Sequence, residues 1–227
     1  MRRIFIASTQ PEDWQRLLAD PEKHWRTGFS AKALAHCWEY ADGFPDEIAR
    51  LFVGSRIKAF QGMEVLLILP EYQSPLPGGR RPSQSDIFVL ARAQDQLISI
   101  VVEGKVSEPF GPTLEEWNAT ASEGKTRRLA FLRELLGLSP GLPSYIRYQL
   151  CHRAASSIVE AQRFNARSAV MLVHSFSQTD EWFEDYQAFL DLLEVTAGPN
   201  QLVFVKTLQG IDLYCGWVRG NERYRRV

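Results

Sequence analysis

Two carboxylates and one ammonium group stand out in this sequence because of their spacing. Asp86 lies at the head of one predicted strand, and Glu103 and Lys105 lie near the end of the next. Since side chains alternate along a strand, Glu103 and Lys105 share a face, with Cα atoms roughly 7 Å apart. Gly104 between them has no side chain on the opposite face, which allows close packing there. If the two strands pair, Asp86 lies across from Glu103 at the rim of a sheet.

This trio of side chains is suited to phosphate chemistry. Two carboxylates offer hard oxygen ligands to Mg²⁺ or Mn²⁺. Such a metal stabilises negative charge on a phosphoryl group and lowers the pKa of a bound water, and a lysine can orient that water. We therefore predict Asp86, Glu103 and Lys105 as catalytic residues, with Asp86 and Glu103 as metal ligands.

The alternative is that these charges are solvated at the end of a strand, as most charged side chains are. Against it, Glu103 directly follows the largely apolar run of residues 98–102. A charge that emerges from a buried strand is costly unless it is paired or binds a metal. This context favours a functional site over a solvated surface.

The elements around the trio follow from the periodicity of apolar residues. Residues 86–91 and 97–106 predict two strands joined by a hairpin connection, whereas the proline- and glycine-rich residues 70–82 predict a loop. Further strands are expected at residues 4–7, 65–69, 169–174, 202–207 and 211–218, and helices at residues 31–41, 45–52, 126–136, 144–164 and 180–193. Strand hairpins followed by a helical crossover predict an α/β fold with a mixed central sheet flanked by helices.

The order and spacing of these elements resemble the PD-(D/E)XK nuclease superfamily, whose core is restriction-endonuclease-like. In that core a helix precedes a three-stranded meander, and a crossover helix and a further strand follow. The matching part is residues 30–176, where the motif reads SD, ending at Asp86, and then EGK. The resemblance implies that Asp86 and Glu103 bind the metal and that Lys105 is the catalytic lysine. Ser85 stands where that superfamily often has proline.

The whole chain also resembles a family of uncharacterised bacterial proteins, which supplies no established activity. The stretches that carry this likeness are RPSQSDIFVLARA, VEGKVSEPFGPT, RYQLCHRAAS and AVMLVHSFSQ. A length of 227 residues favours a single α/β domain over residues 1–227. We expect its core at residues 30–176, with an extra N-terminal segment at residues 1–29 and a C-terminal hairpin within residues 177–227.

Three further residues are candidates to support the trio. Superfamily members often place a glutamate before the aspartate motif, and Glu64, ahead of the strand at residues 65–69, is the preferred match. In recombination-type relatives a glutamine on the long helix supports the metal site, and the resemblance carries this role to Gln149. His152 lies on the same side of that helix. The alternatives are a solvated charge for Glu64 and a surface or capping histidine for His152.

Three arginines are candidates for contacts with substrate phosphates. Arg80 and Arg81 lie in the predicted loop before Asp86, and Arg153 lies on the long helix, where the recombination-type relatives have tyrosine. The alternative is that the loop arginines are solvated and that Arg153 pairs with a nearby acid.

Composition excludes several classes of function. Lysine and arginine total 26 and aspartate and glutamate 27, so at a net charge of −1 the chain does not coat nucleic acid by charge alone, although a local basic cleft remains open. The three cysteines lie far apart, which suits a reducing compartment and offers no zinc-ligand pair. No apolar run reaches the length of a signal-peptide core or a membrane span. We therefore expect a cytoplasmic protein with no membrane contact.

The function that the sequence favours is a Mg²⁺- or Mn²⁺-dependent phosphodiester hydrolase, that is, a nuclease acting on DNA or RNA. The alternative is a catalytically inactive, nuclease-like interaction module that keeps the trio as an ion-pair cluster. A third interpretation is hydrolysis of another phosphate ester, such as a nucleotide, which a small closed pocket would favour over an open groove. Nucleic acid is the expected partner, and a homodimer is left open.

Overall fold

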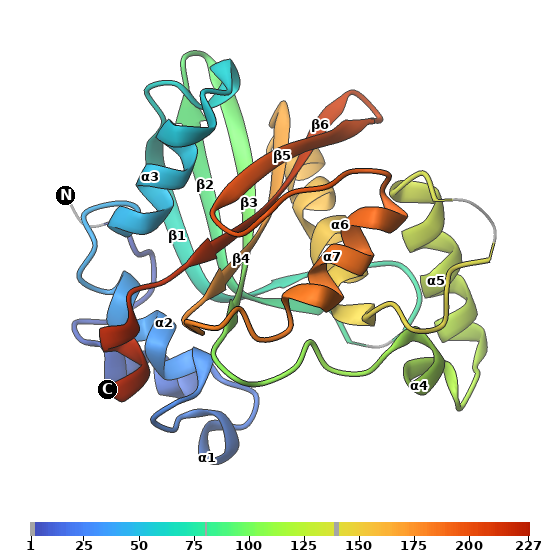
Figure 1. Ribbon diagram of the computed structural model, residues 1–227, viewed down its shortest axis with the longest axis horizontal. Helices are drawn as coiled ribbons and strands as arrows, with labels where there is room; N and C mark the ends of the chain where they lie inside the picture. The colour runs from blue at the N-terminus through green and yellow to red at the C-terminus, as the bar shows by residue number, and fades with distance from the viewer. Residues whose placement is uncertain (1–2, 80, 139–140) are drawn as a thin grey trace.

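A mixed sheet of six strands forms the centre of the computed structural model, which describes residues 3–79, 81–138 and 141–227 (Figure 1). The strands lie in the order β1-β2-β3-β4-β6-β5. Their bounds are β1 Glu64–Ser74, β2 Ser83–Ala93, β3 Gln96–Lys105, β4 Ser168–Ser175, β5 Gln201–Leu208 and β6 Ile211–Arg219. The helices are α1 Pro21–His24, α2 Ser30–Trp38, α3 Asp46–Ser55, α4 Leu114–Asn118, α5 Glu123–Leu135, α6 Tyr148–Arg163 and α7 Phe183–Leu192, with 3₁₀ helices η1 Pro11–Leu17, η2 Lys58–Phe60 and η3 Glu222–Arg226.

The sheet combines antiparallel and parallel pairing. β1, β2 and β3 form an antiparallel meander, β4 lies parallel to β3, β6 lies parallel to β4, and β5 closes the far edge antiparallel to β6. Helix α6 follows β3 in the chain, packs on β3 and β4, and leads into β4. Every residue of β4 is buried, as expected for a parallel strand covered on both faces. This arrangement confirms the predicted α/β fold with a mixed sheet flanked by helices.

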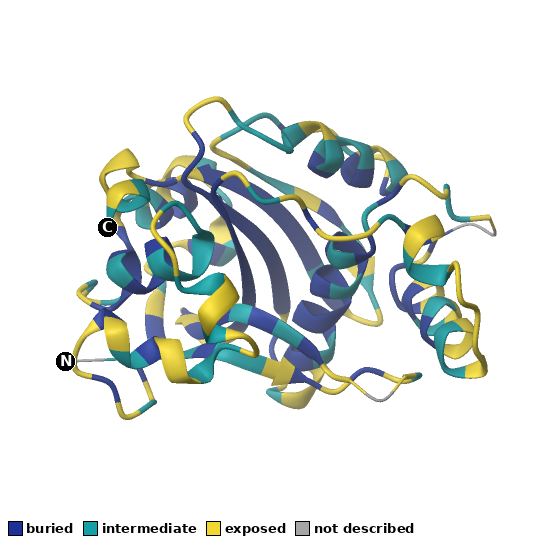
Figure 2. Ribbon diagram, turned by 90° about the horizontal axis from the view of Figure 1, so that it is seen from below, coloured by how far each residue is buried: buried dark blue, intermediate teal, exposed yellow. Residues whose placement is uncertain are grey.

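Helices cover both faces of the sheet, so the central strands are buried and the outer helix surfaces are exposed (Figure 2). On β4, Met171 belongs to the core beneath α5, α6 and α7, whereas Leu172 belongs to the core beneath α2 and α3. The two residues belong to different cores because successive side chains of a strand point to opposite faces. Within the described ranges, no helix has both the length and the apolar character that crossing a membrane requires.

The segment at residues 70–82, predicted as a loop with room for a hairpin turn, is strand at residues 70–74. β1 continues to Ser74 and β2 begins at Ser83, so the hairpin is longer than its composition indicates. Pro70 is tolerated inside β1 because that strand lies at the edge of the sheet, where a missing N–H breaks no ladder on the inner side. The proline and glycine content of this segment therefore marks the end of an edge strand and the loop that joins Ser74 to Ser83.

The long helix is shorter than predicted. α6 begins at Tyr148 instead of residue 144, because residues 144–146 form a turn in which the Ile146 N–H donates to Pro143 at 3.2 Å. Arg147 is then extended, and the Ile146 carbonyl accepts a backbone hydrogen bond from Leu114 at 2.8 Å. The predicted N-terminal strand at residues 4–7 is present only as an isolated bridge to the outer edge of β1.

Candidate functional site

Three carboxylates, here called the acid row, lie side by side across β1, β2 and β3. The pairs of Pro70 with Ile87 and of Tyr72 with Ser85 bring Glu71 level with Asp86, and one step beyond the pair of Ile87 with Val102 brings Asp86 level with Glu103. Opposed residues of antiparallel strands have Cα atoms about 4.5–5.5 Å apart, and like charges in such pairs are destabilising. The fold therefore maintains an unfavourable juxtaposition of acids at one end of the meander.

Glu71 is the member of the acid row that the sequence analysis missed. It follows Pro70 in the edge strand and has φ of 51°, a left-handed conformation that is uncommon for a residue with a side chain. Gln84 donates to its Oε2 at 2.7 Å. A signal for Glu71 is present in the sequence, because Gly78-Gly79 is a favourable hairpin turn and equal counting outward from it pairs Glu71 with Asp86.

Asp86, Glu103 and Lys105 converge as predicted, although Glu103 is already paired. Asp86 Oδ2 accepts a hydrogen bond from the backbone N–H of Gly104 at 2.7 Å. Lys105 Nζ donates to Glu103 Oε1 at 2.5 Å, and Arg153 Nε donates to Glu103 Oε2 at 2.5 Å. Both oxygens of Glu103 therefore contact a cation, and the side chain is buried.

Close packing of α2 against β3 fixes the position of these groups. A Cβ atom on Gly104 would lie 2.3 Å from Leu34 Cδ1, so that side chain would have to move, and at 3.2 Å from Ser30 Cβ it would be tightly packed. The glycine between Glu103 and Lys105 thus allows the close approach that the sequence predicts.

The acid row divides electrostatically into one carboxyl with a lowered pKa, Glu103, and two with raised pKa values, Glu71 and Asp86. Burial raises the pKa of Glu71 to about 8, and the neighbouring Asp86 adds to the shift. Burial raises the pKa of Asp86 to about 7, with repulsion from Glu103 as the next cause. Burial also acts on Glu103, but Arg153 and Lys105 outweigh it and hold the pKa of that carboxyl below its ordinary value. Positive charge is therefore lacking at Glu71 and Asp86 and sufficient at Glu103.

The acid row lines a pocket of about 470 Å³, here called the acid pocket, together with Lys105 and Gln149. Gln149 Oε1 is buried and accepts no hydrogen bond from any described residue. A buried acceptor without a donor costs free energy and is rare in native structures. The amide oxygen is therefore placed to accept from a molecule or ion in the pocket, where the sequence analysis expects Gln149 to act.

Glu64 does not belong to this site. Its carboxylate pairs with Arg3 at 2.7 Å and with Arg92 at 3.2 Å on the surface. It precedes Glu71 on β1 by seven residues, which corresponds to roughly 20 Å along an extended strand. The prediction of Glu64 as a supporting acid is corrected to a surface ion pair, which is close to the solvated charge considered as its alternative.

Arg153, predicted to contact substrate phosphates, is buried and bonded to Glu103 instead. Its Nη1 also donates to Ser83 Oγ at 3.0 Å. A guanidinium whose donors are directed into the protein is not presented to a ligand. The structure therefore corrects this prediction in favour of its alternative, pairing with a nearby acid.

His152 and Arg81 line a different pocket, of about 550 Å³, and Arg80 lies outside the described residues. His152 Nδ1 lies 2.8 Å from Ser83 Oγ, which links it through Arg153 to Glu103. Burial holds the pKa of His152 well below its ordinary value, so the ring is neutral. The structure thus places His152 next to the site without bringing it into the acid pocket.

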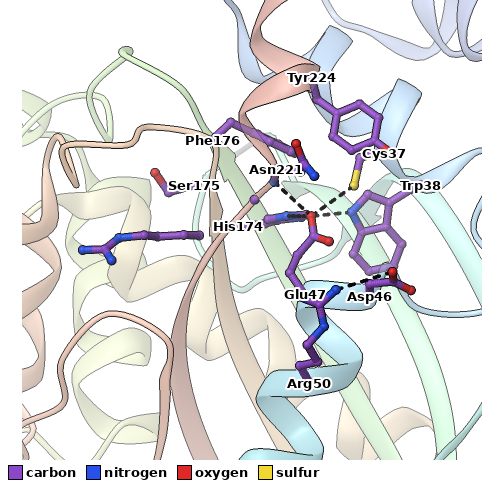
Figure 3. Close-up of polar contacts among 12 residues, drawn as sticks. Cys37, Trp38, Asp46, Glu47, Arg50, His174, Ser175, Phe176, Asn221 and Tyr224 are labelled. Carbon is purple, nitrogen blue, oxygen red and sulfur yellow. Dashed lines mark hydrogen bonds and ion pairs between the residues drawn. The ribbon is translucent and has the colours of Figure 1, made fainter.

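A second buried polar cluster, here called the Glu47 cluster, lies where α2, α3 and β4 meet (Figure 3). Glu47 Oε1 lies 3.2 Å from His174 Nε2, 3.6 Å from Cys37 Sγ and 3.3 Å from the backbone nitrogen of Asn221. The ligand atoms of Cys37, Glu47 and His174 all lie within 4.8 Å of one another. Thiolate, carboxylate and imidazole at such spacing are a set that a transition metal can bind.

The tautomer of His174 argues against a metal at the Glu47 cluster. Trp38 Nε1 lies 3.2 Å from His174 Nδ1, and an indole N–H is a donor only. Because Nδ1 accepts, the ring proton lies on Nε2, which donates to Glu47 instead of offering a lone pair to a metal. The cluster is a continuous hydrogen-bond chain from Trp38 through His174 to Glu47. Sequence spacing does not predict it, because its members come from separate elements.

Comparisons with known proteins place the chain in a family without assigning an activity. A search of curated proteins and a search of solved structures each returned no match. Residues 7–222 match a family described as a domain of unknown function, DUF6946. Because this match spans nearly the whole sequence, the chain belongs to the DUF6946 family.

Proposed function

We propose that the protein is a Mg²⁺-dependent phosphodiester hydrolase acting on DNA or RNA, with the acid row and Lys105 as its reactive centre. The observation that carries the proposal is the pair of opposed acids, Glu71 and Asp86, whose pKa values rise to about 8 and about 7. Strongly perturbed acids in a pocket are typical of functional sites, and a divalent cation would relieve their repulsion.

The order of elements also supports the proposal. A helix, an antiparallel meander, a crossover helix and a strand parallel to the third strand of the meander follow one another here. This is the order that the PD-(D/E)XK resemblance implies, and Asp86 and Glu103 occupy adjacent strands at the expected end of the meander.

The donor atoms fit a hard divalent cation. Asp86 Oδ1 and Gln149 Oε1 accept no hydrogen bond from the described residues, and Glu71 is held close by through Gln84. Oxygen ligands of this kind suit Mg²⁺. Both oxygens of Glu103 are taken by Lys105 and Arg153, so Asp86 and Glu71 with Gln149 and water, instead of the predicted pair Asp86 and Glu103, would hold the ion. When bound, Mg²⁺ would neutralise charge on the phosphoryl oxygens and lower the pKa of a water.

The side chains around the pocket have distinct tasks in this reaction, in which water forms one P–O bond as one P–O ester bond breaks. Lys105, buried between Glu103 and the ring of Phe110, holds its ammonium at a fixed place, from which it orients the attacking water. Arg153 is a positioning residue, because it holds the other oxygen of Glu103. The leaving oxygen takes up a proton from solvent.

A second candidate function is a non-catalytic interaction module on the same fold. The observation that favours it is the full pairing of Glu103 by Lys105 and Arg153, which completes an ion-pair cluster without a metal. This candidate predicts binding that is independent of divalent cations.

Cleavage assays with Mg²⁺ and Mn²⁺ on labelled DNA and RNA strands separate the two candidates. The proposal expects divalent-dependent cleavage that falls at least about 100-fold in Lys105→Ala. Lys58→Ala is the matched control, since Lys58 is exposed and lines none of the pockets described above. Absence of cleavage together with absence of Mn²⁺ binding in calorimetry would favour the interaction module.

A further inference from the structure

The walls of the acid pocket come from three parts of the chain. The floor is formed by the ends of β1, β2 and β3, and α6 contributes Gln149. The loop after β3 contributes Glu108, Pro109 and Gly111. The segment that precedes the meander contributes Leu18, Ala19, Lys23, His24, Phe29, Ser30 and Ala31. The N-terminal segment, expected to elaborate the core, therefore forms one side of the pocket.

Hydrogen bonds hold this wall in place. Glu108 Oε1 accepts from the backbone N–H of Ser30 at 2.8 Å, while Oε2 accepts from Val106 at 3.1 Å and Ser107 at 3.0 Å. One carboxylate thereby joins the first residue of α2 to the loop after β3. The wall is a fixed part of the pocket, so its side chains contribute to recognition in a defined geometry.

The wall combines cationic and apolar groups. The side chains of Lys23 and His24 line the pocket, and neither forms an ion pair or hydrogen bond with another described residue. Phe29 and Leu18 are half-buried and line the same space. The unpaired Lys23 ammonium attracts phosphates, the His24 imidazole can donate a hydrogen bond to them, and aromatic side chains stack with nucleobases independently of sequence. Together they form a surface that complements a nucleotide whose phosphate faces the acid row.

We propose that the acid pocket takes an unpaired polynucleotide strand, with a phosphate at Lys23 and His24 and a base against Phe29. This inference rests on the proposed function, because the acid row would act on the bound strand. DNA and RNA strands share this chemistry, and both are arms of the test below.

Burial of the reactive groups favours an unpaired strand over a duplex. Glu103 is 2% exposed and Lys105 is 3% exposed, so a phosphodiester reaches them only by entering the pocket. A duplex keeps its direction over about 150 base pairs and cannot bend into a cavity of this size. A single strand rotates freely about its backbone and can place one nucleotide inside.

Binding measured with Ca²⁺ in place of Mg²⁺ tests this inference separately from cleavage. Fluorescence anisotropy with the full chain compares a labelled unpaired DNA strand, the same strand as RNA, and the matching duplex. We expect an unpaired strand of at least one sugar type to bind at least about 10-fold more tightly than the duplex. Lys23→Ala should weaken strand binding several-fold and reduce the slope of log K against log salt by about 0.7, the value for one phosphate contact.

Two further variants make the outcome decisive. Phe29→Leu keeps apolar volume but removes the aromatic face, and it should weaken strand binding about 10-fold, as expected for loss of one stacked base. Lys58→Ala should leave strand binding unchanged. Equal or tighter binding of the duplex, or unchanged binding in both Lys23→Ala and Phe29→Leu, would overturn the inference. Divalent-dependent cleavage with a duplex preference would overturn this inference alone, whereas selective strand binding without cleavage would overturn the hydrolase and leave the binding surface.

Discussion

The acid row and the Glu47 cluster are both buried polar groups beside the central sheet, yet their electrostatics are opposite. In the Glu47 cluster, burial alone would raise the pKa of Glu47, but hydrogen bonds from His174 and from the Asn221 backbone lower it to about 2. In the acid row, burial and mutual repulsion leave Glu71 and Asp86 with raised pKa values. A buried acid is therefore not by itself a sign of a reactive site. The informative sign is a buried acid that has too few hydrogen-bond donors and cations around it, so that its pKa is raised.

The largest expected effect on stability concerns Glu103, whose carboxylate pairs with Lys105 and Arg153. Arg153→Ala leaves buried Glu103 with one partner, and we expect a loss of about 3–5 kcal/mol in the free energy of unfolding. Urea unfolding measures it. Arg50→Ala is the control, because Arg50 forms an exposed pair with Asp46 and should change stability by less than about 0.5 kcal/mol. A loss as small as that of the control would show that Glu103 is not held by Arg153.

The next effect is a pH dependence set by the unsatisfied acids. Folding raises the pKa of Glu71 from 4.5 to about 8 and that of Asp86 from 3.8 to about 7, so the folded state binds more protons than the unfolded state between these limits. Stability in metal-free buffer should therefore fall by several kcal/mol as pH rises from about 4 to about 8.

Glu71→Gln tests the origin of that slope. It should flatten the loss between pH 5 and 8 and make the protein more stable than the wild type at pH 8, when both are unfolded by urea in chelator. A slope that persists unchanged in both Glu71→Gln and Asp86→Asn would assign it to other groups.

A glutamate-to-glutamine substitution in the Glu47 cluster should change the free energy of unfolding in the direction opposite to Glu71→Gln. Glu47→Gln removes the carboxylate that accepts from His174 and Asn221, and we expect a loss of about 1–3 kcal/mol at pH 7. Because its folded pKa is lowered, Glu47 contributes stability above its unfolded pKa of 4.5, and this contribution is lost as pH falls toward 2. Urea titrations at pH 3 and 7 measure both, and a stabilised Glu47→Gln protein at pH 7 would remove the contrast between the clusters.

The smallest expected effect is stabilisation by the cation itself. Mg²⁺ at about ten times its Kd should add about 1–2 kcal/mol to the free energy of unfolding at pH 8, and less at pH 6, where protons compete for Asp86 and Glu71. Asp86→Asn should abolish the gain, whereas Glu47→Gln should retain it. Thermal unfolding with and without Mg²⁺ at the two pH values gives the comparison, and a gain that survives Asp86→Asn would place the cation elsewhere.

Local patterns were sufficient for much of the fold and for part of the site. Strand alternation and the run before Glu103 predicted the convergence of Asp86, Glu103 and Lys105, because adjacent strands of a meander must pair. Glu71 was not predicted because proline and glycine made its segment resemble a loop, whereas β1 runs on through it to Ser74. Glu64 was chosen by its place before the motif, and the extended strand carries it too far from Asp86.

By itself, the sequence determined the order of elements, the α/β class and the identity of the trio, since these depend on periodicities of two and 3.6 residues that a chain carries locally. Only the tertiary structure decided that Arg153 faces Glu103, that Lys23 and His24 line the acid pocket, and that three donors converge on Glu47 Oε1. Those contacts depend on the rotation of each helix about its axis and on its position against the sheet. Packing of the whole core fixes that rotation, and no short stretch of sequence specifies it.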